Sequence, residues 1–250
     1  LELLDAPGEW YFDKEQNQIY FYPPEGKSPD KLLIEGSVRS TGLTIIDGVV
    51  QNIRFQHQQD IGLEIDGISV VQYCEFEGIG RDAKVSEQAA GGAALHANEN
   101  TRKTRISHNT FENNFNKAID WWQNPKDTTA SVIERNIVNN TGVVDGYGGS
   151  GSWHAVAILI GRGRNVHVQY NRIDKAGYVG ILFGSAGNYA EYNVINNAMY
   201  TLNDGGGIYT NCSRSTIRYN IILNTRGGME SSGSWATIAH GIWPEFLREY

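Results

Sequence analysis

The stretch VHVQYNRIDKAGYVGILFGSAGNYAEYNVI, residues 166–195, contains the two motifs that decide the fold. It begins with alternating apolar and polar residues that lead into the Asn motif Tyr170-Asn171-Arg172-Ile173. A small residue followed by an apolar one comes next, at Gly180-Ile181. The Asn motif then returns 22 residues later as Tyr192-Asn193-Val194-Ile195. Alternation with a period of two is typical of strands that bury one face. Self-similarity along the chain predicts a stacked repeat architecture.

Both motifs recur through most of the chain. The small-residue step occurs at Gly62-Leu63, Ala94-Leu95, Ala118-Ile119, Ala157-Ile158, Gly180-Ile181, Gly207-Ile208 and Gly241-Ile242. The second motif places Cys74, Asn109, Asn136, Asn171, Asn193 and Asn220 at intervals of 35, 27, 35, 22 and 27 residues. The shortest interval fits one turn of three short strands, and longer intervals add a loop. Leucine-rich repeats have similar lengths but require a Leu-x-x-Leu-x-Leu strand. Since Ile, Val and Phe fill the inward positions here, the sequence predicts an all-β parallel β-helix, a solenoid.

The Asn column also predicts how each coil turns. Asn tolerates the left-handed backbone conformation that most residues resist, so we expect it at the bend. Identical amides stacked about 4.8 Å apart can bond to each other and to the turn backbone. Cys74 replaces Asn in this column and is many residues from Cys212, so we expect two structural thiols and no disulfide.

Residues 5–35 follow a different pattern. Two apolar-alternating runs surround KEQNQ (residues 14–18) and end at Pro23-Pro24, which predicts a β-hairpin. We therefore expect a small hairpin element over residues 1–31, part of the same module, and the β-helix over residues 32–250. The chain begins without Met and ends just after a repeat step, so we interpret both ends as cut from a longer protein.

Charge and hydropathy limit the partners. The net charge of −7 argues against a nucleic-acid groove or an anionic membrane surface. No run of 18 apolar residues is present, so no transmembrane helix is expected. The 13 Tyr, 6 Trp and 8 Phe residues suit stacking on sugar faces, although aromatic residues also cover strands. We expect a monomer whose partner is a polysaccharide or an oligosaccharide.

The longest insertions all fall between an Asn motif and the next small-residue step. They therefore emerge from one bend and form one wall of a groove, with the following strands as its floor. Two residues after each small residue the side chains point outward, at Glu64, His96, Asp120, Leu159, Leu182, Tyr209 and Trp243. This column changes from polar to aromatic, as a polysaccharide cleft does. The alternative is an ordinary solvated sheet face.

The strongest candidate for a catalytic residue is Asp204, in the sequence TLNDGGGIYT. A carboxylate at a loop-to-strand junction, followed by three glycines that permit close approach, suits acid–base or nucleophilic catalysis. The alternative is an Asx-turn that only organises the bend.

The motifs DGGGIYT, HGIWPE and the upstream PGEWYFDKEQNQIYFYPP together resemble right-handed parallel β-helix glycoside hydrolases. Among these, they resemble glycoside hydrolase family 141 and its relatives, a group with fucosidase and xylanase members. The resemblance implies catalytic carboxylates at Asp204 and Glu245. Straight strands would separate these two by about 23 Å, so the pair requires a sharp bend. Glu230 and Asp145, on loops from the same bend, are alternatives for the second carboxylate.

Several further side chains lie on the groove side. His154 and His240 immediately precede a small-residue step, and His96 and Asp120 lie in the floor column. Trp153, Trp243 and Tyr209 lie on the groove strand or its loops and are candidates for sugar stacking or for loop anchoring. With Asp145, these residues form the predicted substrate-binding set. No His or Cys spacing typical of zinc is present, so no metal site and no cofactor are expected.

Three functions fit this pattern. The first is a secreted or periplasmic glycoside hydrolase that degrades a plant or algal polysaccharide with paired carboxylates. The second is a polysaccharide lyase, which needs a Lys, Arg or His base and often Ca²⁺. Lys117, Lys175, Arg162 and Arg164 are its candidate bases, and none lies in the floor column. The third is a non-catalytic carbohydrate-binding β-helix, since fold alone does not decide function.

Overall fold

The computed structural model describes residues 4–24, 26–81, 92–144, 147, 153–228 and 238–244. The chain divides into two compact units, Leu1–Gly36 and Ser37–Tyr250. Among the described residues the only helical element is the short 3-10 turn η1 (Pro29–Lys31), in the first unit.

The first unit is built on an antiparallel hairpin of β1 (Trp10–Asp13) and β2 (Gln18–Phe21). Asp13 Oδ1 accepts hydrogen bonds from the backbone N–H groups of Glu15 at 2.9 Å and Gln16 at 3.0 Å. Asn17 closes the turn in the left-handed conformation, with φ at 52°. The hairpin predicted around residues 14–18 is therefore confirmed.

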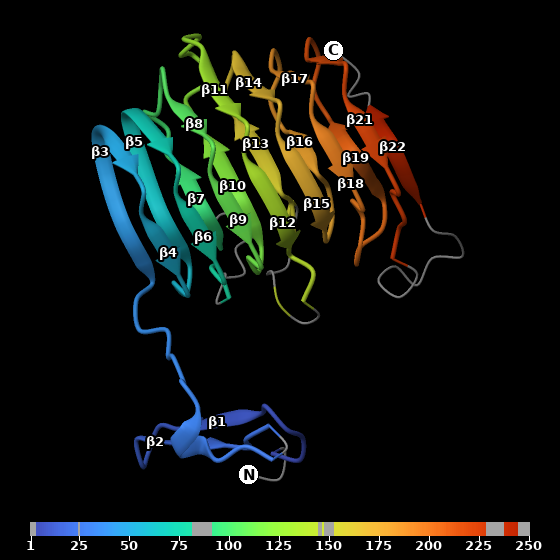
Figure 1. The fold of residues 1–250 in the computed structure, drawn as a ribbon. Helices are drawn as coiled ribbons and strands as arrows, with labels where there is room; N and C mark the ends of the chain where they lie inside the picture. Colours follow the sequence, from blue (N-terminus) through green and yellow to red (C-terminus); the bar gives the residue numbers. More distant parts are fainter. Residues whose placement is uncertain are drawn as a thin grey trace. The chain divides into compact units, whose positions relative to one another are not determined.

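The second unit consists of parallel strands in three ladders (Figure 1). The first ladder contains β3 (Thr41–Gln51), β5 (Ile61–Gln72), β7 (Ala93–Ala97), β10 (Lys117–Trp122), β13 (Ile158–Arg162), β16 (Ile181–Phe183), β19 (Gly205–Thr210) and β22 (Ala239–Pro244). The second continues from β5 through β8 (Arg105–Ser107), β11 (Ser131–Glu134), β14 (Val166–Gln169), β17 (Tyr189–Glu191) and β20 (Thr216–Arg218). The third contains β4 (Arg54–Gln56), β6 (Glu75–Glu77), β9 (Thr110–Glu112), β12 (Ile137–Thr141), β15 (Arg172–Ala176), β18 (Val194–Asn196) and β21 (Ile221–Leu223).

The chain visits the three ladders in turn, and each circuit forms one coil. The long strands β3 and β5 each pass through the first two ladders, and their pairing shifts register between Ile46 and Gly48. Every pairing in this unit is parallel, as in β10 with β13 or β12 with β15. The predicted all-β architecture with parallel strands is confirmed.

Apolar side chains from all three ladders meet in one core. Phe55, Phe76 and Phe111, on successive strands of the third ladder, stack with ring centroids 5.0 Å and 4.7 Å apart. The small residue of each step from Gly62 to Gly207 faces this core. A Cβ atom on Gly62 would lie 2.6 Å from the backbone oxygen of Ala94, so a larger residue would require the backbone to move.

The predicted amide ladder is present in the core. The Asn109 side-chain amide donates to Asn136 Oδ1 at 3.0 Å, and the same bond joins Asn136 to Asn171 and Asn171 to Asn193. Each amide also donates to a backbone carbonyl, such as that of Ile106 for Asn136 at 3.0 Å. Cys74 ends the ladder as a buried free thiol, and burial raises its pKa.

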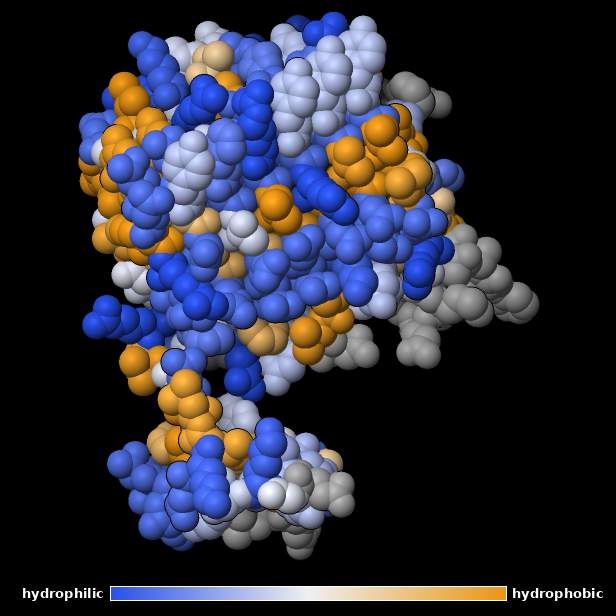
Figure 2. Space-filling view, viewed as in Figure 1, coloured by the Kyte–Doolittle hydropathy of each residue, from blue (hydrophilic) through white to orange (hydrophobic). Residues whose placement is uncertain are grey.

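The left-handed residue of each turn differs from the prediction. It is the residue before each Asn, because the amide must point into the core to join the ladder. These left-handed residues are Tyr73, His108, Arg135, Tyr170, Tyr192 and Tyr219. Their side chains point outward, and the rings of Tyr170 and Tyr192 stack 4.9 Å apart. Figure 2 shows one face of this unit, on which hydrophilic residues predominate and hydrophobic ones gather in small patches.

Candidate functional site

The outer face of the first ladder holds the candidate site. Strand pairing confirms the predicted alignment of the floor column. Successive partners are Glu64 with His96, His96 with Asp120, Asp120 with Leu159, Leu159 with Leu182, Leu182 with Tyr209, and Tyr209 with Trp243. The side chain of Lys117, three residues before Asp120, reaches the same side of β10 as Asp120 does. Outward side chains on this strand therefore include the position three residues before the floor column.

The middle of this face is closed, contrary to the expected open floor. Leu159 and Leu182 are fully buried in a second apolar cluster with Val156, Val179 and Met199. Aromatic side chains cover the cluster, namely Trp122, Trp153, Tyr178 and Tyr209. Trp153 lies so close to Gly184 that a Cβ atom there would meet its ring at 2.9 Å. In this structure the loop-anchoring interpretation of Trp153 therefore applies.

A buried polar cluster lies on one side of this apolar cluster, centred on Asp120. Asp120 Oδ2 lies 3.2 Å from His96 Nδ1 and 3.3 Å from Lys117 Nζ, and Oδ1 accepts a 2.6 Å bond from Trp122 Nε1. The side chains of Asp120, Lys117 and His96 are 0%, 1% and 14% exposed. Such burial is tolerated because the opposite charges are in contact.

Glu64 extends this cluster through an amide. His96 Nε2 lies 3.1 Å from Asn98 Oδ1, and the Asn98 amide nitrogen donates to Glu64 Oε1 at 2.8 Å. Both nitrogens of the His96 ring therefore face acceptor oxygens, as a protonated imidazole requires. Burial alone lowers the pKa of His96, but the hydrogen bond and charge of Asp120, together with Glu64, outweigh it. The pKa of His96 is raised above its usual value of 6.5.

Asp120 is held in its charged form by the same contacts. Burial raises the pKa of this carboxyl, but the Lys117 ammonium, His96 and the Trp122 N–H together lower it below its usual 3.8. A carboxylate in contact with the buried Lys117 ammonium and the His96 ring, with a lowered pKa, is a poor proton donor near neutral pH. The cluster is suited to holding charge rather than to general-acid chemistry.

A second group surrounds Asp204. The Tyr178 hydroxyl donates to the Asp204 carbonyl at 2.7 Å, and the Tyr178 ring stacks on His154 with centroids 6.3 Å apart. The Asp204 backbone N–H donates to the Ile238 carbonyl at 2.9 Å, with φ at 69°. Its carboxylate is exposed and makes no hydrogen bond or ion pair to any described residue, so no Asx-turn is formed there. The structure thus brings His154 and Asp204 together at Tyr178.

The remaining aromatic candidates lie on the next two strands. Tyr209 on β19 pairs with Trp243 on β22, and their rings stack 6.4 Å apart. His240 meets Trp243 edge-on at 4.3 Å, and it pairs with Gly206, two residues after Asp204. Tyr209 lies on β19, five residues after Asp204, and with Trp243 it forms a half-buried aromatic surface of the kind that sugars stack on.

The two groups are too far apart to act as one carboxylate pair. Asp120 lies on β10 and Asp204 precedes β19, three strand spacings away, or about 14 Å. Glycoside hydrolysis requires carboxylates about 5–9.5 Å apart. On the outward positions of β16, β19 and β22 the described residues include no second acid. The other predicted acids, Glu245, Glu230 and Asp145, lie outside the described residues.

Sequence reasoning missed three members of the site. Lys117 was expected off the outward face, yet it contacts Asp120 because the strand presents outward residues three apart at the step. Trp122 was expected only as one of the tryptophans on or beside the groove strand, for sugar stacking or loop anchoring, and not as a partner of Asp120; Tyr178 was not singled out. The sequence does distinguish Lys117. In the coils that begin at β7, β10, β13, β16 and β19, it is the only charged residue that immediately precedes a small-residue step.

No group of three or more His, Cys, Asp or Glu side chains suited to a metal ion occurs among the described residues. The same part of the chain includes no helix long and apolar enough to cross a membrane. No model of a known family, no curated protein and no solved structure matches this chain.

Proposed function

We propose that this chain is a right-handed parallel β-helix that hydrolyses glycosidic bonds of a plant or algal polysaccharide outside the cytoplasm. The fold proposal rests on the three parallel ladders, visited in the same order in every coil. The family proposal rests on the resemblance of DGGGIYT and HGIWPE to glycoside hydrolase family 141.

The free carboxylate of Asp204 carries the functional proposal. It is exposed and is not engaged by any described residue, and the backbone carbonyl of the same residue accepts a hydrogen bond from Tyr178, whose ring stacks on His154. The half-buried Tyr209–Trp243 pair supplies an aromatic platform on β19 and β22, with Tyr209 five residues further along the chain than Asp204. In this mechanism Asp204 protonates the leaving oxygen or attacks the anomeric carbon, and Glu230 or Glu245 takes the other role.

A polysaccharide lyase is the second candidate, and one contact favours it. Lys117 is on the outer face of the first ladder beside His96 and Asp120, so the argument that no basic side chain reaches the floor no longer holds. However, Lys117 is 1% exposed and its ammonium lies 3.3 Å from a carboxylate. Its ammonium is therefore shielded from solvent and already has a carboxylate partner, so it is poorly placed to abstract a proton from a uronate.

The test is release of reducing ends from a panel of neutral and acidic polysaccharides by three proteins. These are the wild type, Asp204→Asn and the control Glu112→Gln, which alters an exposed acid on β9 of the third ladder. We expect the wild type and the control to be equally active and Asp204→Asn to lose at least about a hundredfold in kcat. The melting temperature of Asp204→Asn should be unchanged, because its carboxylate holds no described residue. Equal activity of all three proteins would remove Asp204 from the mechanism.

A further inference from the structure

A cavity of about 350 Å³ lies away from the candidate active site, at the turns between the first and second ladders. Arg164, Ala186, Gly187 and Arg214 line it, together with Asn165 and Tyr189. The three turns belong to consecutive coils. The Asn165 backbone N–H donates to the Gly187 carbonyl at 3.0 Å, and the Thr216 N–H donates to the Asn188 carbonyl at 2.8 Å.

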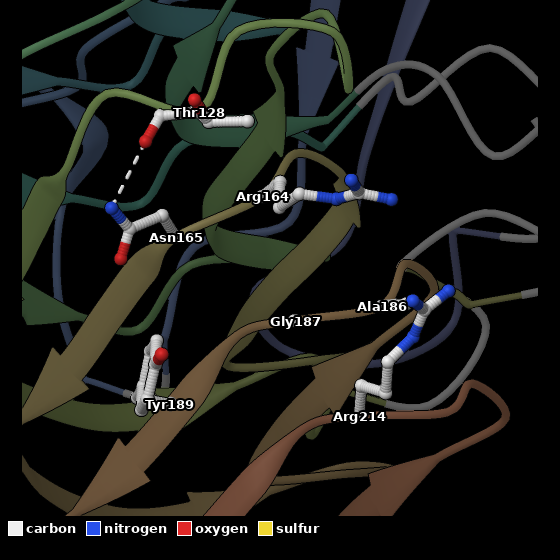
Figure 3. A pocket seen from close by; sticks show the side chains of 7 residues that line it. All are labelled: Thr128, Arg164, Asn165, Ala186, Gly187, Tyr189 and Arg214. Carbon is white, nitrogen blue, oxygen red and sulfur yellow. Dashed lines mark hydrogen bonds between the residues drawn. The ribbon is translucent and has the colours of Figure 1, made fainter.

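Two guanidinium groups flank the turn of the middle coil. Figure 3 shows Arg164 and Arg214 extending to the same side of the turn that holds Ala186 and Gly187. Arg164 lies over Gly187, since a Cβ atom there would meet Arg164 Cγ at 3.3 Å. Their backbones are two coils apart, about 10 Å, and the middle coil contributes only Ala186 and Gly187 between them. The space between the two side chains is therefore open.

Neither guanidinium is neutralised. No carboxylate among the described residues lies within 4.0 Å of Arg164 or Arg214, although other arginines of this unit, such as Arg54, are paired with glutamates. The chain carries a net charge of −7, so two adjacent unpaired cations are a marked local reversal of sign. Each guanidinium offers five N–H donors in a planar fork that matches the oxygens of a carboxylate or sulfate group.

The frame around the cavity is held in place by its own hydrogen bonds. The Asn165 amide nitrogen donates to the Thr128 carbonyl at 3.0 Å, and its oxygen lies 3.0 Å from His167 Nε2. The ring of Tyr189 stacks on His167 at 4.3 Å. The Asn188 amide nitrogen donates to the Ser185 carbonyl at 2.8 Å, which fixes the turn below Arg164. These contacts hold the backbone around the cavity in place, so ligand binding requires only the two arginine side chains to change conformation.

We propose that this cavity binds an oxyanion group, the carboxylate or sulfate of an acidic saccharide, between Arg164 and Arg214. A free inorganic anion offers the same chemistry from another source. The inference does not rest on the proposed hydrolase, because binding can be measured without turnover. It predicts that recognition of acidic chains occurs at the edge of the first ladder rather than only on its outer face.

The test is calorimetric titration at low salt with a galacturonic-acid oligosaccharide, a neutral oligosaccharide of equal length, and inorganic sulfate. The proteins are the wild type, the double variant Arg164→Gln/Arg214→Gln, and the control Arg172→Gln, which removes an exposed arginine on β15. We expect the wild type to bind the acidic oligosaccharide and not the neutral one. The double variant should bind at least about tenfold more weakly, and the control within about twofold of the wild type.

Each outcome is decisive. Tighter binding of sulfate than of the acidic oligosaccharide, dependent on the same two arginines, supports the oxyanion site and identifies a free ion as its source. Acidic-oligosaccharide binding that is unchanged in the double variant overturns the proposal, as does the absence of binding by any anion. Circular dichroism of the double variant should match the wild type, because both arginine side chains are exposed.

Discussion

Substitution of Asp120 by Asn should destabilise the protein more than most single changes. The carboxylate is 0% exposed and contacts Lys117 Nζ at 3.3 Å and His96 Nδ1 at 3.2 Å. The amide keeps an acceptor oxygen for the Trp122 N–H but carries no charge to balance the buried Lys117 ammonium. Removing one partner of a buried ion pair costs about 3–5 kcal/mol of the free energy of unfolding. For a chain of this size the melting temperature should fall by roughly 10 °C.

Urea unfolding followed by circular dichroism measures this loss, and a second variant separates charge from packing. Asp120→Asn combined with Lys117→Met buries one fewer cation, so it should recover at least about half of the lost free energy. A loss below about 1 kcal/mol in Asp120→Asn would refute the reasoning, because it would mean that the cluster is open to water. Failure of the double variant to recover any stability would show that the charge of Lys117 is not the cause.

Three further changes test other parts of the structure. In His96→Gln the stability deficit relative to the wild type should be full below pH 6.5, the usual pKa, and should shrink as pH rises through the raised folded pKa; a deficit that grows with pH would contradict the assignment. Asn171→Ala should cost about 3 kcal/mol in urea unfolding, because it removes the buried acceptor of both the Asn136 backbone N–H and the Asn136 side-chain amide. The control Asn100→Ala, which loses one exposed bond to Asp66, should cost less than about 1 kcal/mol. Tyr178→Phe removes the donor to the Asp204 carbonyl and should cost about 1 kcal/mol, and an unchanged unfolding midpoint would mean that this bond contributes nothing.

The repeat made much of the fold predictable from the sequence. A period of two within strands and a recurring Asn place each side chain in a ladder, so the floor column from Glu64 to Trp243 was aligned correctly. The same logic identified the amide stack through Asn171. It misassigned the left-handed residue by one position, because an Asn can serve either the bend or the core, and here the core ladder determined its orientation.

The surroundings of the site were less predictable, because they depend on contacts across coils. Leu159 and Leu182 are outward by register, yet aromatic side chains from the loops and neighbouring strands bury them. Nothing in the periodicity of β13 indicates that Trp153 folds over Gly184 on the next coil. The Lys117–Asp120 pair was likewise hidden, because the strand departs from simple alternation at the small-residue step.

The most direct test of the central claim, that this chain hydrolyses glycosidic bonds through Asp204, is the fate of the water oxygen. The wild type and Asp204→Asn are each incubated with a cleavable polysaccharide in water labelled with ¹⁸O. Mass spectrometry then measures the masses of the products from the two proteins. Hydrolysis predicts one labelled oxygen in each new product pair from the wild type and no product from the variant. Unlabelled, unsaturated products would contradict the claim, since elimination takes no oxygen from water.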